Sequence, residues 1–159
     1  MPTSDPTRPP FLRRWRSVRV AVADESMRPA LAPGDRLWVE WRRPGTPLPE
    51  VGEVVVVPDP EASGRWLVKR VAAVGPAHVY VVRRGVVVRP TGSVGDRPAD
   101  AIDETAVPAG SVYVLSDGGV GGRDSRRFGP VPAERLVGVA WWRYAPRDRI
   151  GPLPGPPEP

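Results

Sequence analysis

Lysine occurs once in this chain. Of its 23 basic residues, 22 are arginine and only Lys69 is lysine. Arginine stays protonated in proteins, whereas a lysine amine can lose its proton and act as a base. The count therefore marks Lys69 as a candidate base. Drift in amino-acid composition would also leave a single lysine, and the count alone does not separate these explanations.

A lysine base needs surroundings that lower its pKa. At an unperturbed pKa of ~10.4, only about one amine in 2,500 is neutral at pH 7, and burial in an apolar environment lowers that pKa. Leu67, Lys69 and Val71 share one face of an expected strand, because side chains alternate with a period of two. The sequence thus predicts a buried amine with apolar neighbours.

Other common nucleophiles and bases are excluded by composition. The chain has no cysteine and one histidine, which excludes disulfides, thiolate nucleophiles and metal sites built on several imidazoles, and we expect no cofactor. His78 lies in an expected hairpin with no carboxylate near it in sequence, so a Ser-His-Asp arrangement is not expected. A serine activated by lysine is the option that remains.

Ser26 is the candidate nucleophile. It ends an expected strand, and Pro29 three residues later turns the chain away from the sheet. Such a bend can expose a hydroxyl at a sheet edge beside backbone N–H groups that stabilise an oxyanion. An ordinary turn serine has the same local sequence, so the pattern alone leaves both interpretations open.

Short valine-rich segments separated by glycine and proline turns predict the scaffold, and helical periodicity is almost absent. We therefore predict a mainly β fold, with one helical turn after Pro132. A turn-rich stretch at about 76–110 predicts a small inserted β lobe. Strands are expected over 18–23, 36–41, 53–58, 65–74, 78–83, 86–89, 111–116 and 136–144.

The two ends are proline-rich and are expected to form tails over 1–17 and 147–159. Five arginines against Asp5 give the first twenty residues a net charge of +4, out of +5 for the chain. A solvated tail explains this charge, and weak contact with an anionic membrane surface is the alternative. Nucleic-acid binding is not expected. The arginines are Arg8, Arg13, Arg14, Arg16 and Arg19.

No run of apolar residues approaches 18, so we expect neither a membrane-spanning helix nor a cleavable secretory signal in this sequence. The expected location is the cytoplasm, at most peripheral to a membrane.

Five short motifs, in this order, resemble those of the type I signal peptidases (family S26), serine proteases that are related to self-cleaving repressor proteases. The motifs are Ser26-Met27-x-Pro29, Gly34-Asp35, Lys69-Arg70-Val71, Ser116-Asp117 and Asp124-Ser125-Arg126-x-Phe128-Gly129-Pro130-Val131-Pro132. The resemblance spans about 18 to 153. It implies the coiled β-sheet fold of that family over 18–146, and a Ser/Lys dyad that cleaves a leader or signal segment after small residues.

The resemblance also implies roles for individual residues. Ser26 would attack the scissile carbonyl and its N–H would bind the oxyanion, while Lys69 would be the base. Met27 and Pro29 would shape a substrate pocket for an extended peptide. The implied supporting residues, with Asp124 and Arg126 as an ion pair, are Asp117, Asp124, Ser125 and Arg126. Some soluble relatives mature nickel-containing enzymes, which is a further option here.

The chain departs from the family pattern near the dyad. Asp24 stands where many members have glycine or serine, and Gly122 stands where a serine commonly orients the lysine. Ser116 or Ser125 are candidate substitutes for that serine. The family's Gly-Asp-Asn is Ser116-Asp117-Gly118 here. These differences leave a second hypothesis open, a peptide-binding module on the same fold that does not cut.

Overall fold

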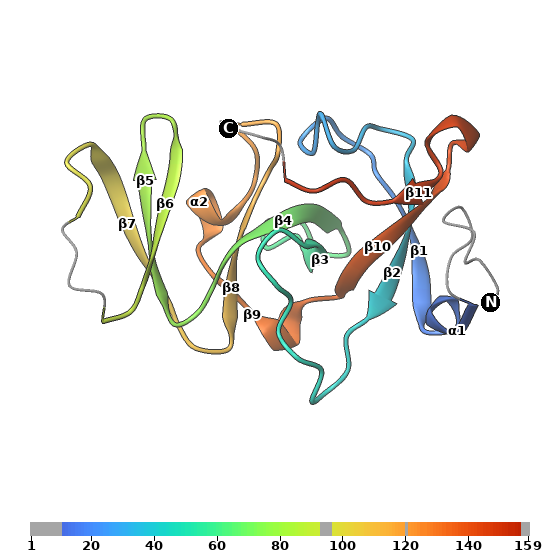
Figure 1. The fold of residues 1–159 in the computed structure, drawn as a ribbon, viewed down its shortest axis with the longest axis horizontal. Helices are drawn as coiled ribbons and strands as arrows, with labels where there is room; N and C mark the ends of the chain where they lie inside the picture. The colour runs from blue at the N-terminus through green and yellow to red at the C-terminus, as the bar shows by residue number, and fades with distance from the viewer. Residues whose placement is uncertain (1–10, 93–96, 120, 157–159) are drawn as a thin grey trace, which may run out of the picture.

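Two antiparallel sheets form the fold in the computed structural model, which describes residues 11–92, 97–119 and 121–156 (Figure 1). The larger sheet has the strand order β1-β2-β10-β3-β4-β8-β9, with β11 beside β10. Its strands are β1 (Ser17–Ala21), β2 (Arg36–Trp41), β3 (Val54–Pro58), β4 (Trp66–Val74), β8 (Ser111–Leu115), β9 (Val131–Pro132), β10 (Gly138–Ala145) and β11 (Gly151–Pro152). The predicted mainly β fold is confirmed.

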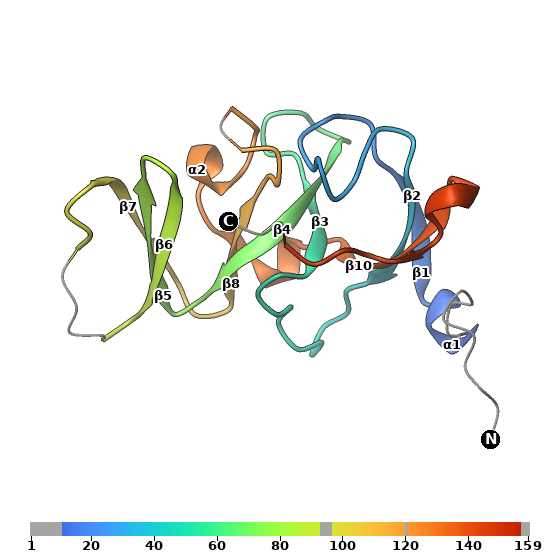
Figure 2. The same ribbon diagram turned by 45° about the horizontal axis from the view of Figure 1, so that its top comes forward.

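The smaller sheet comprises β5 (Ala77–Val82), β6 (Gly85–Pro90) and β7 (Ala101–Val107), in the order β6-β5-β7. It lies at the end of the molecule opposite α1 (Phe11–Arg14), in the stretch expected to form an inserted lobe (Figures 1 and 2). The sequence did not predict β7, because most of its residues are exposed and its polar residues are consecutive, without the alternation typical of a strand.

Valine runs form the centre of the larger sheet. Val54, Val55, Val56 and Val57 of β3 are all buried because β3 pairs with β4 on one side and β10 on the other, and both faces of the sheet are covered. Val54 and Val56 belong to one apolar cluster, and Val55 and Val57 to another. The sheet therefore separates two cores, and β4 carries Lys69 beside them.

The N-terminal segment differs from the expected tail. Residues 1–10, including Arg8, lie outside the described residues, but α1 and Ser17 are ordered parts of the fold. Arg13 donates to Glu40 at 2.6 Å and its guanidinium lies 5.0 Å from the centre of the Trp141 ring. Charge pairing and stacking on an aromatic face explain why this segment folds back. Membrane contact of the arginine cluster stays a prediction.

The C-terminal segment also differs from the expected tail. The short helix η2 (Arg147–Arg149) and β11 continue the fold, and Leu153 packs against the first core. Ion pairs of Arg143 and Arg149 with buried Asp35 hold this segment in place. The reason is tertiary pairing, which proline content does not reveal. Residues 157–159 lie outside the described part of the chain.

Three short helices complete the chain between β8 and β11. The helical turn predicted after Pro132 is present as η1 (Ala133–Arg135), and η2 follows β10. The sequence did not predict α2 (Ser125–Phe128), a single turn capped by Asp124. None of the helices in the described ranges has the length and apolar character that crossing a membrane requires.

Truncation of Leu37 tests the first core. Leu37 is fully buried in that cluster, so we expect Leu37→Ala to lower the free energy of unfolding by about 3 kcal/mol. Ile102→Ala, at a position that is 65% exposed, is the control and should change it by less than about 0.5 kcal/mol. Urea titration measures both, and equal effects of the two substitutions would contradict the assigned core.

Candidate active site

Ser26 and Lys69 meet where the loop after β1 reaches β4 of the larger sheet. Ser26 lies in the loop between β1 and β2, and Lys69 lies in β4 opposite Val55 of β3. Although 43 residues separate them in sequence, Lys69 Nζ and Ser26 Oγ are 2.8 Å apart. Only 1% of Lys69 is exposed. The structure thus joins an alcohol to a buried amine.

The surroundings of Lys69 lower its pKa from the ordinary value of 10.5, chiefly because burial disfavours the charged ammonium. Asp24 and Asp124 attract the ammonium and act in the opposite direction, while Arg123 repels it and lowers the pKa further. The effect of desolvation is larger than that of the two carboxylates, so the pKa of Lys69 is lowered. A larger share of the amine is therefore neutral near pH 7 than for an exposed lysine.

A turn after β8 positions the nucleophile loop. The Gly118 N–H donates to the Ser26 carbonyl at 2.8 Å. A Cβ atom at position 118 would lie 3.0 Å from that carbonyl oxygen, a contact too tight for a side chain without a shift of the backbone. The departure at Gly118 from the family's asparagine thus coincides with a close approach of two backbones.

Arg70 and Asp117 stabilise the same turn from the other side of β4. Arg70 Nε donates to Asp117 Oδ1 at 2.8 Å and its terminal nitrogen to Asp117 Oδ2 at 2.6 Å, with both side chains at most 6% exposed. Arg70 also donates to the Gly52 carbonyl at 2.8 Å. Sequence reasoning gave Arg70 no role, although its place next to Lys69 in the motif was a signal.

Asp124 joins α2 to β8. Arg126 donates to both of its carboxylate oxygens, at 3.0 and 2.6 Å, and the Ser116 N–H donates to Oδ2 at 3.0 Å. Ser125 Oγ accepts from the Val114 N–H at 2.9 Å. Asp124 and Arg126 therefore form the ion pair that the resemblance implied. The Ser125 hydroxyl binds the backbone of β8, so it is not directed at Lys69.

Ser116 and Gly122 occupy the place of the missing family serine. A Cβ atom on Gly122 would lie 2.3 Å from Ser116 Oγ, so the hydroxyl of Ser116 fills the space that a side chain at position 122 would enter. This Oγ is buried and has no hydrogen-bond partner among the described residues. Of the two candidate substitutes, Ser116 is the one whose hydroxyl lies there.

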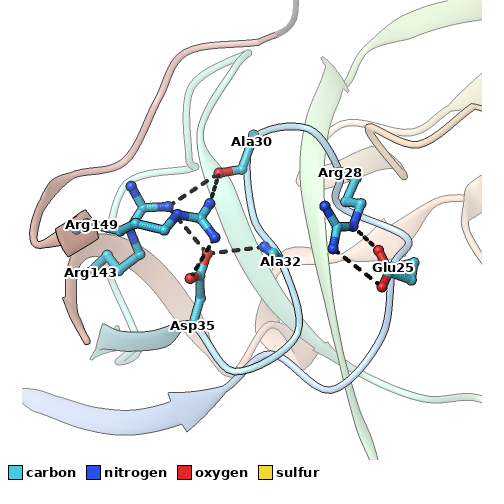
Figure 3. Close-up of polar contacts among 7 residues, drawn as sticks. All are labelled: Glu25, Arg28, Ala30, Ala32, Asp35, Arg143 and Arg149. Carbon is cyan, nitrogen blue, oxygen red and sulfur yellow. Dashed lines mark hydrogen bonds and ion pairs between the residues drawn. The ribbon is translucent and has the colours of Figure 1, made fainter. Parts of the chain in front are cut away.

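A buried ionic cluster holds the far end of the nucleophile loop (Figure 3). Asp35 is fully buried and pairs with Arg143 at 3.2 Å and with Arg149 at 3.0 Å. Its Oδ2 also accepts from the Ala32 N–H at 3.0 Å, and both arginines donate to the Ala30 carbonyl. The cluster ties the loop to β10 and η2. Sequence reasoning gave Asp35 no role beyond the motif.

Two cavities flank Ser26. One, of about 160 Å³, lies between the end of β1 and the start of β4, and Met27 and Leu67 contribute to its wall. The other, of about 380 Å³, opens beside Ser26 and Lys69. Asp24 borders both. Pro29 is exposed and lines neither of these two cavities, and its place in the wall of the substrate pocket stays a prediction.

Asp24 lies against the nucleophile. Its Oδ1 accepts a hydrogen bond from the Ser26 N–H at 2.9 Å, and its side chain is exposed. Burial alone would raise the pKa of Asp24, but hydrogen bonds from Ser26 and attraction by Lys69 and Arg123 outweigh it and lower that pKa below 3.8. The carboxylate is therefore charged at neutral pH.

No group of three or more histidine or acidic side chains in the described ranges is arranged to hold a metal ion. The chemistry available from the side chains at the site is that of a hydroxyl, an amine and a carboxylate.

Comparison with known proteins gives the class and then the family. Three relatives are peptidases by name. "Probable signal peptidase I-1" of Synechocystis sp. is 31% identical over 83% of this chain and 73% of its own length. "Mitochondrial ATP-independent inner membrane protease subunit 1b" of Arabidopsis thaliana is 34% identical over 80% and 70%. "Probable thylakoidal processing peptidase 2, chloroplastic" of the same plant is 28% identical over 82% and 38%.

The family model described as "Signal peptidase, peptidase S26" matches residues 11–97 and 89–145. The chain therefore belongs to the S26 family of signal peptidases, and its relatives indicate a serine-type peptidase. Among solved structures, a signal peptidase I from Enterococcus faecalis V583 gives a TM-score of 0.45 at 19% identity, over 60% of this chain and 98% of that one.

Asp124 makes stability depend on pH. Burial alone raises the pKa of Asp124, but hydrogen bonds from Arg126 and Ser116 and the guanidinium charge outweigh it and hold the pKa below 3.8. A carboxyl whose pKa is lowered by folding stabilises the fold above its unfolded pKa, and this stabilisation is lost as pH falls through the folded pKa. Asp124→Asn should therefore lower the free energy of unfolding by about 3 kcal/mol at pH 7, and by less below about pH 4.

Urea titrations of both proteins across this pH range measure the difference. Glu61→Gln, which removes an exposed partner of Arg127, is the control and should cost less than about 1 kcal/mol. A difference between wild type and Asp124→Asn that stays constant with pH would contradict the role assigned to the carboxylate.

Proposed function

We propose that this protein is an endopeptidase in which Ser26 and Lys69 form a Ser/Lys dyad that cleaves a leader or signal segment from a protein substrate. The observation that supports it most directly is the 2.8 Å separation of Lys69 Nζ and Ser26 Oγ, with the amine 1% exposed. Ser26 and Lys69 are far apart in sequence, so the fold, and not the local sequence, brings their side chains together. Membership of the S26 family supports the same conclusion.

In the acylation step, Ser26 Oγ attacks the scissile carbonyl carbon while neutral Lys69 takes the hydroxyl proton. The carbonyl oxygen acquires negative charge, which the Ser26 N–H stabilises in this proposal. As the peptide C–N bond breaks, the Lys69 ammonium returns the proton to the leaving amine. The products are a new N-terminus and an ester of Ser26.

In the deacylation step, water takes the place of the released amine. Neutral Lys69 accepts a proton from this water, whose oxygen attacks the ester carbonyl. Breaking the ester bond returns the proton to Ser26 and restores the dyad. The same amine thus serves both halves of the reaction, and no metal or cofactor enters either step.

The substrate binds as an extended strand in this proposal. β1 is at the edge of the larger sheet, and the cavity of about 160 Å³ lies between the end of β1 and the start of β4. A peptide laid along this opening gains backbone hydrogen bonds, and the cavity receives alternate side chains. A cavity of this size favours small residues before the cut.

Substitution of the dyad tests the proposal. The substrate is an internally quenched peptide with alanine at the first and third positions before the cut. Ser26→Ala and Lys69→Arg should each lower kcat/KM by at least about 10³-fold, because residues that act as one unit lose most activity when either is removed. Lys69→Arg is the stricter test, since it keeps the charge and removes the base.

Retained cleavage in either variant would refute the dyad, provided that thermal unfolding shows both to be folded. The wild type decides between the two functions. If it binds the peptide without cleaving it, and Ser26→Ala binds equally well, the protein is a peptide-binding module on the same fold. Asp24 on the Ser26 N–H is the observation that favours this second function.

The pH dependence of cleavage reports on the amine. Because Lys69 must be neutral to act as a base and burial lowers its pKa below 10.5, kcat/KM should rise with pH and level off above the lowered pKa. Peptide cleavage measured from about pH 5 to about pH 10 gives this profile. A rate that falls with rising pH over this range would contradict a lysine base.

A further inference from the structure

The donor that the proposed reaction needs is already engaged. Asp24 Oδ1 accepts from the Ser26 N–H at 2.9 Å, and this N–H is the group placed to bind the carbonyl oxygen of the substrate. One N–H proton makes one strong, well-aligned hydrogen bond. A substrate carbonyl and the Asp24 carboxylate therefore compete for the same donor.

Charge makes the competition unfavourable to catalysis. The carboxylate is charged at neutral pH, and a charged acceptor binds an N–H about twice as strongly as a neutral carbonyl does. The oxygen of the substrate also becomes negative as Ser26 attacks. A carboxylate at this position would repel the charge that the site has to stabilise.

The same carboxylate acts on the base. The charged groups that face Lys69 are Asp24, Asp117, Asp124 and Arg123. Arg70 pairs with Asp117, Arg126 with Asp124, and Arg123 with Asp59, so each of these charges has an opposite partner. The negative charge of Asp24 instead acts directly on Ser26 and Lys69. It favours the protonated amine, which cannot accept the serine proton.

We propose that Asp24 is an inhibitory gate: its carboxylate occupies the oxyanion donor of Ser26 in the free protein and leaves when the scissile carbonyl of a bound peptide takes its place. This inference rests on the proposed function. The gate can open without disturbing the core, because the Asp24 side chain is exposed and borders both cavities beside Ser26. A peptide that fills the cavity next to β1 approaches the Ser26 N–H from the side where the carboxylate lies.

Two substitutions separate the two effects of Asp24, which are its hydrogen bond with the Ser26 N–H and its negative charge. Asp24→Asn keeps an oxygen that can accept from the Ser26 N–H but removes the charge, and Asp24→Ala removes both. The control is Glu61→Gln, which neutralises a carboxylate that pairs with Arg127 and lines neither cavity beside the dyad.

With the alanine-containing peptide, we expect kcat/KM to rise about tenfold in Asp24→Ala and by less in Asp24→Asn, because the free enzyme no longer has to break the hydrogen bond that occupies its oxyanion donor. Both variants should shift the acidic limb of the kcat/KM profile to lower pH, because the amine loses an attracting charge. Glu61→Gln should leave kcat/KM and its pH profile unchanged. If Asp24 only stabilised the turn, its substitution would change stability without moving the acidic limb of the kcat/KM profile.

A peptide aldehyde that ends in alaninal gives a second measurement. Ser26 Oγ adds to the aldehyde carbon, the serine proton passes to Lys69, and the aldehyde oxygen takes the position of the oxyanion. Asp24→Ala should bind this aldehyde about tenfold more tightly than the wild type, in line with its gain in kcat/KM. Thermal unfolding confirms that each variant is folded.

The outcomes distinguish the inference from the function on which it depends. A wild type that cleaves the peptide, with folded Asp24 variants that are no faster and bind the aldehyde no more tightly, overturns the gate alone. Cleavage that appears only in the Asp24 variants supports the gate in its strongest form. If neither the wild type nor any variant cleaves the peptide or binds the aldehyde, the endopeptidase proposal falls, and the gate falls with it.

Discussion

Removing the Lys69 amine from water is the constraint on which the site depends. An isolated ammonium in an apolar interior costs several kcal/mol, and the group lowers this cost by losing its proton. The central position of β4 between β3 and β8 sets this burial. Nearby carboxylates limit how far the pKa falls. A lysine whose pKa is lowered by burial is thus in large part a product of the sheet order.

The arginines of the site make the opposite contribution, because they remain charged. Arg70, Arg126 and Arg143 each bind a buried carboxylate, and these pairs surround the loop that carries Ser26 and the turn that contacts it. A planar guanidinium that donates to a carboxylate through two nitrogens fixes distance and angle together. Arg70 and Arg126 bind their carboxylates in this way, and Arg143 reaches Asp35 through one nitrogen. At these three positions, permanent charges hold the segments around the group that has to titrate.

The sequence allowed the mainly β fold, most strands and the two central residues to be predicted, because alternation of valines and the apolar neighbours of Lys69 are local signals. The strand β7, the short helix α2 and the ordered ends could not be predicted in the same way. Their stability comes from partners far along the chain, such as Glu40 for Arg13 and Asp35 for Arg149. The motif gives the residue type at Pro29 in the same way, but the direction of the turn decides which cavity its side chain borders.

The two departures from the family pattern next to the dyad differ in kind. At Ser116 and Gly122, the Ser116 hydroxyl fills the space that a side chain at position 122 would enter, so this departure is compatible with a filled site. Asp24 adds a charge and a hydrogen-bond acceptor at a place where packing exerts little restraint, since its side chain is exposed. An exchange that conserves volume needs no further change around it, whereas a new charge shifts the pKa of ionisable groups near it. The chemistry that sets this chain apart from its relatives is therefore to be sought at Asp24, through its effects on the Ser26 N–H and on the protonation of Lys69.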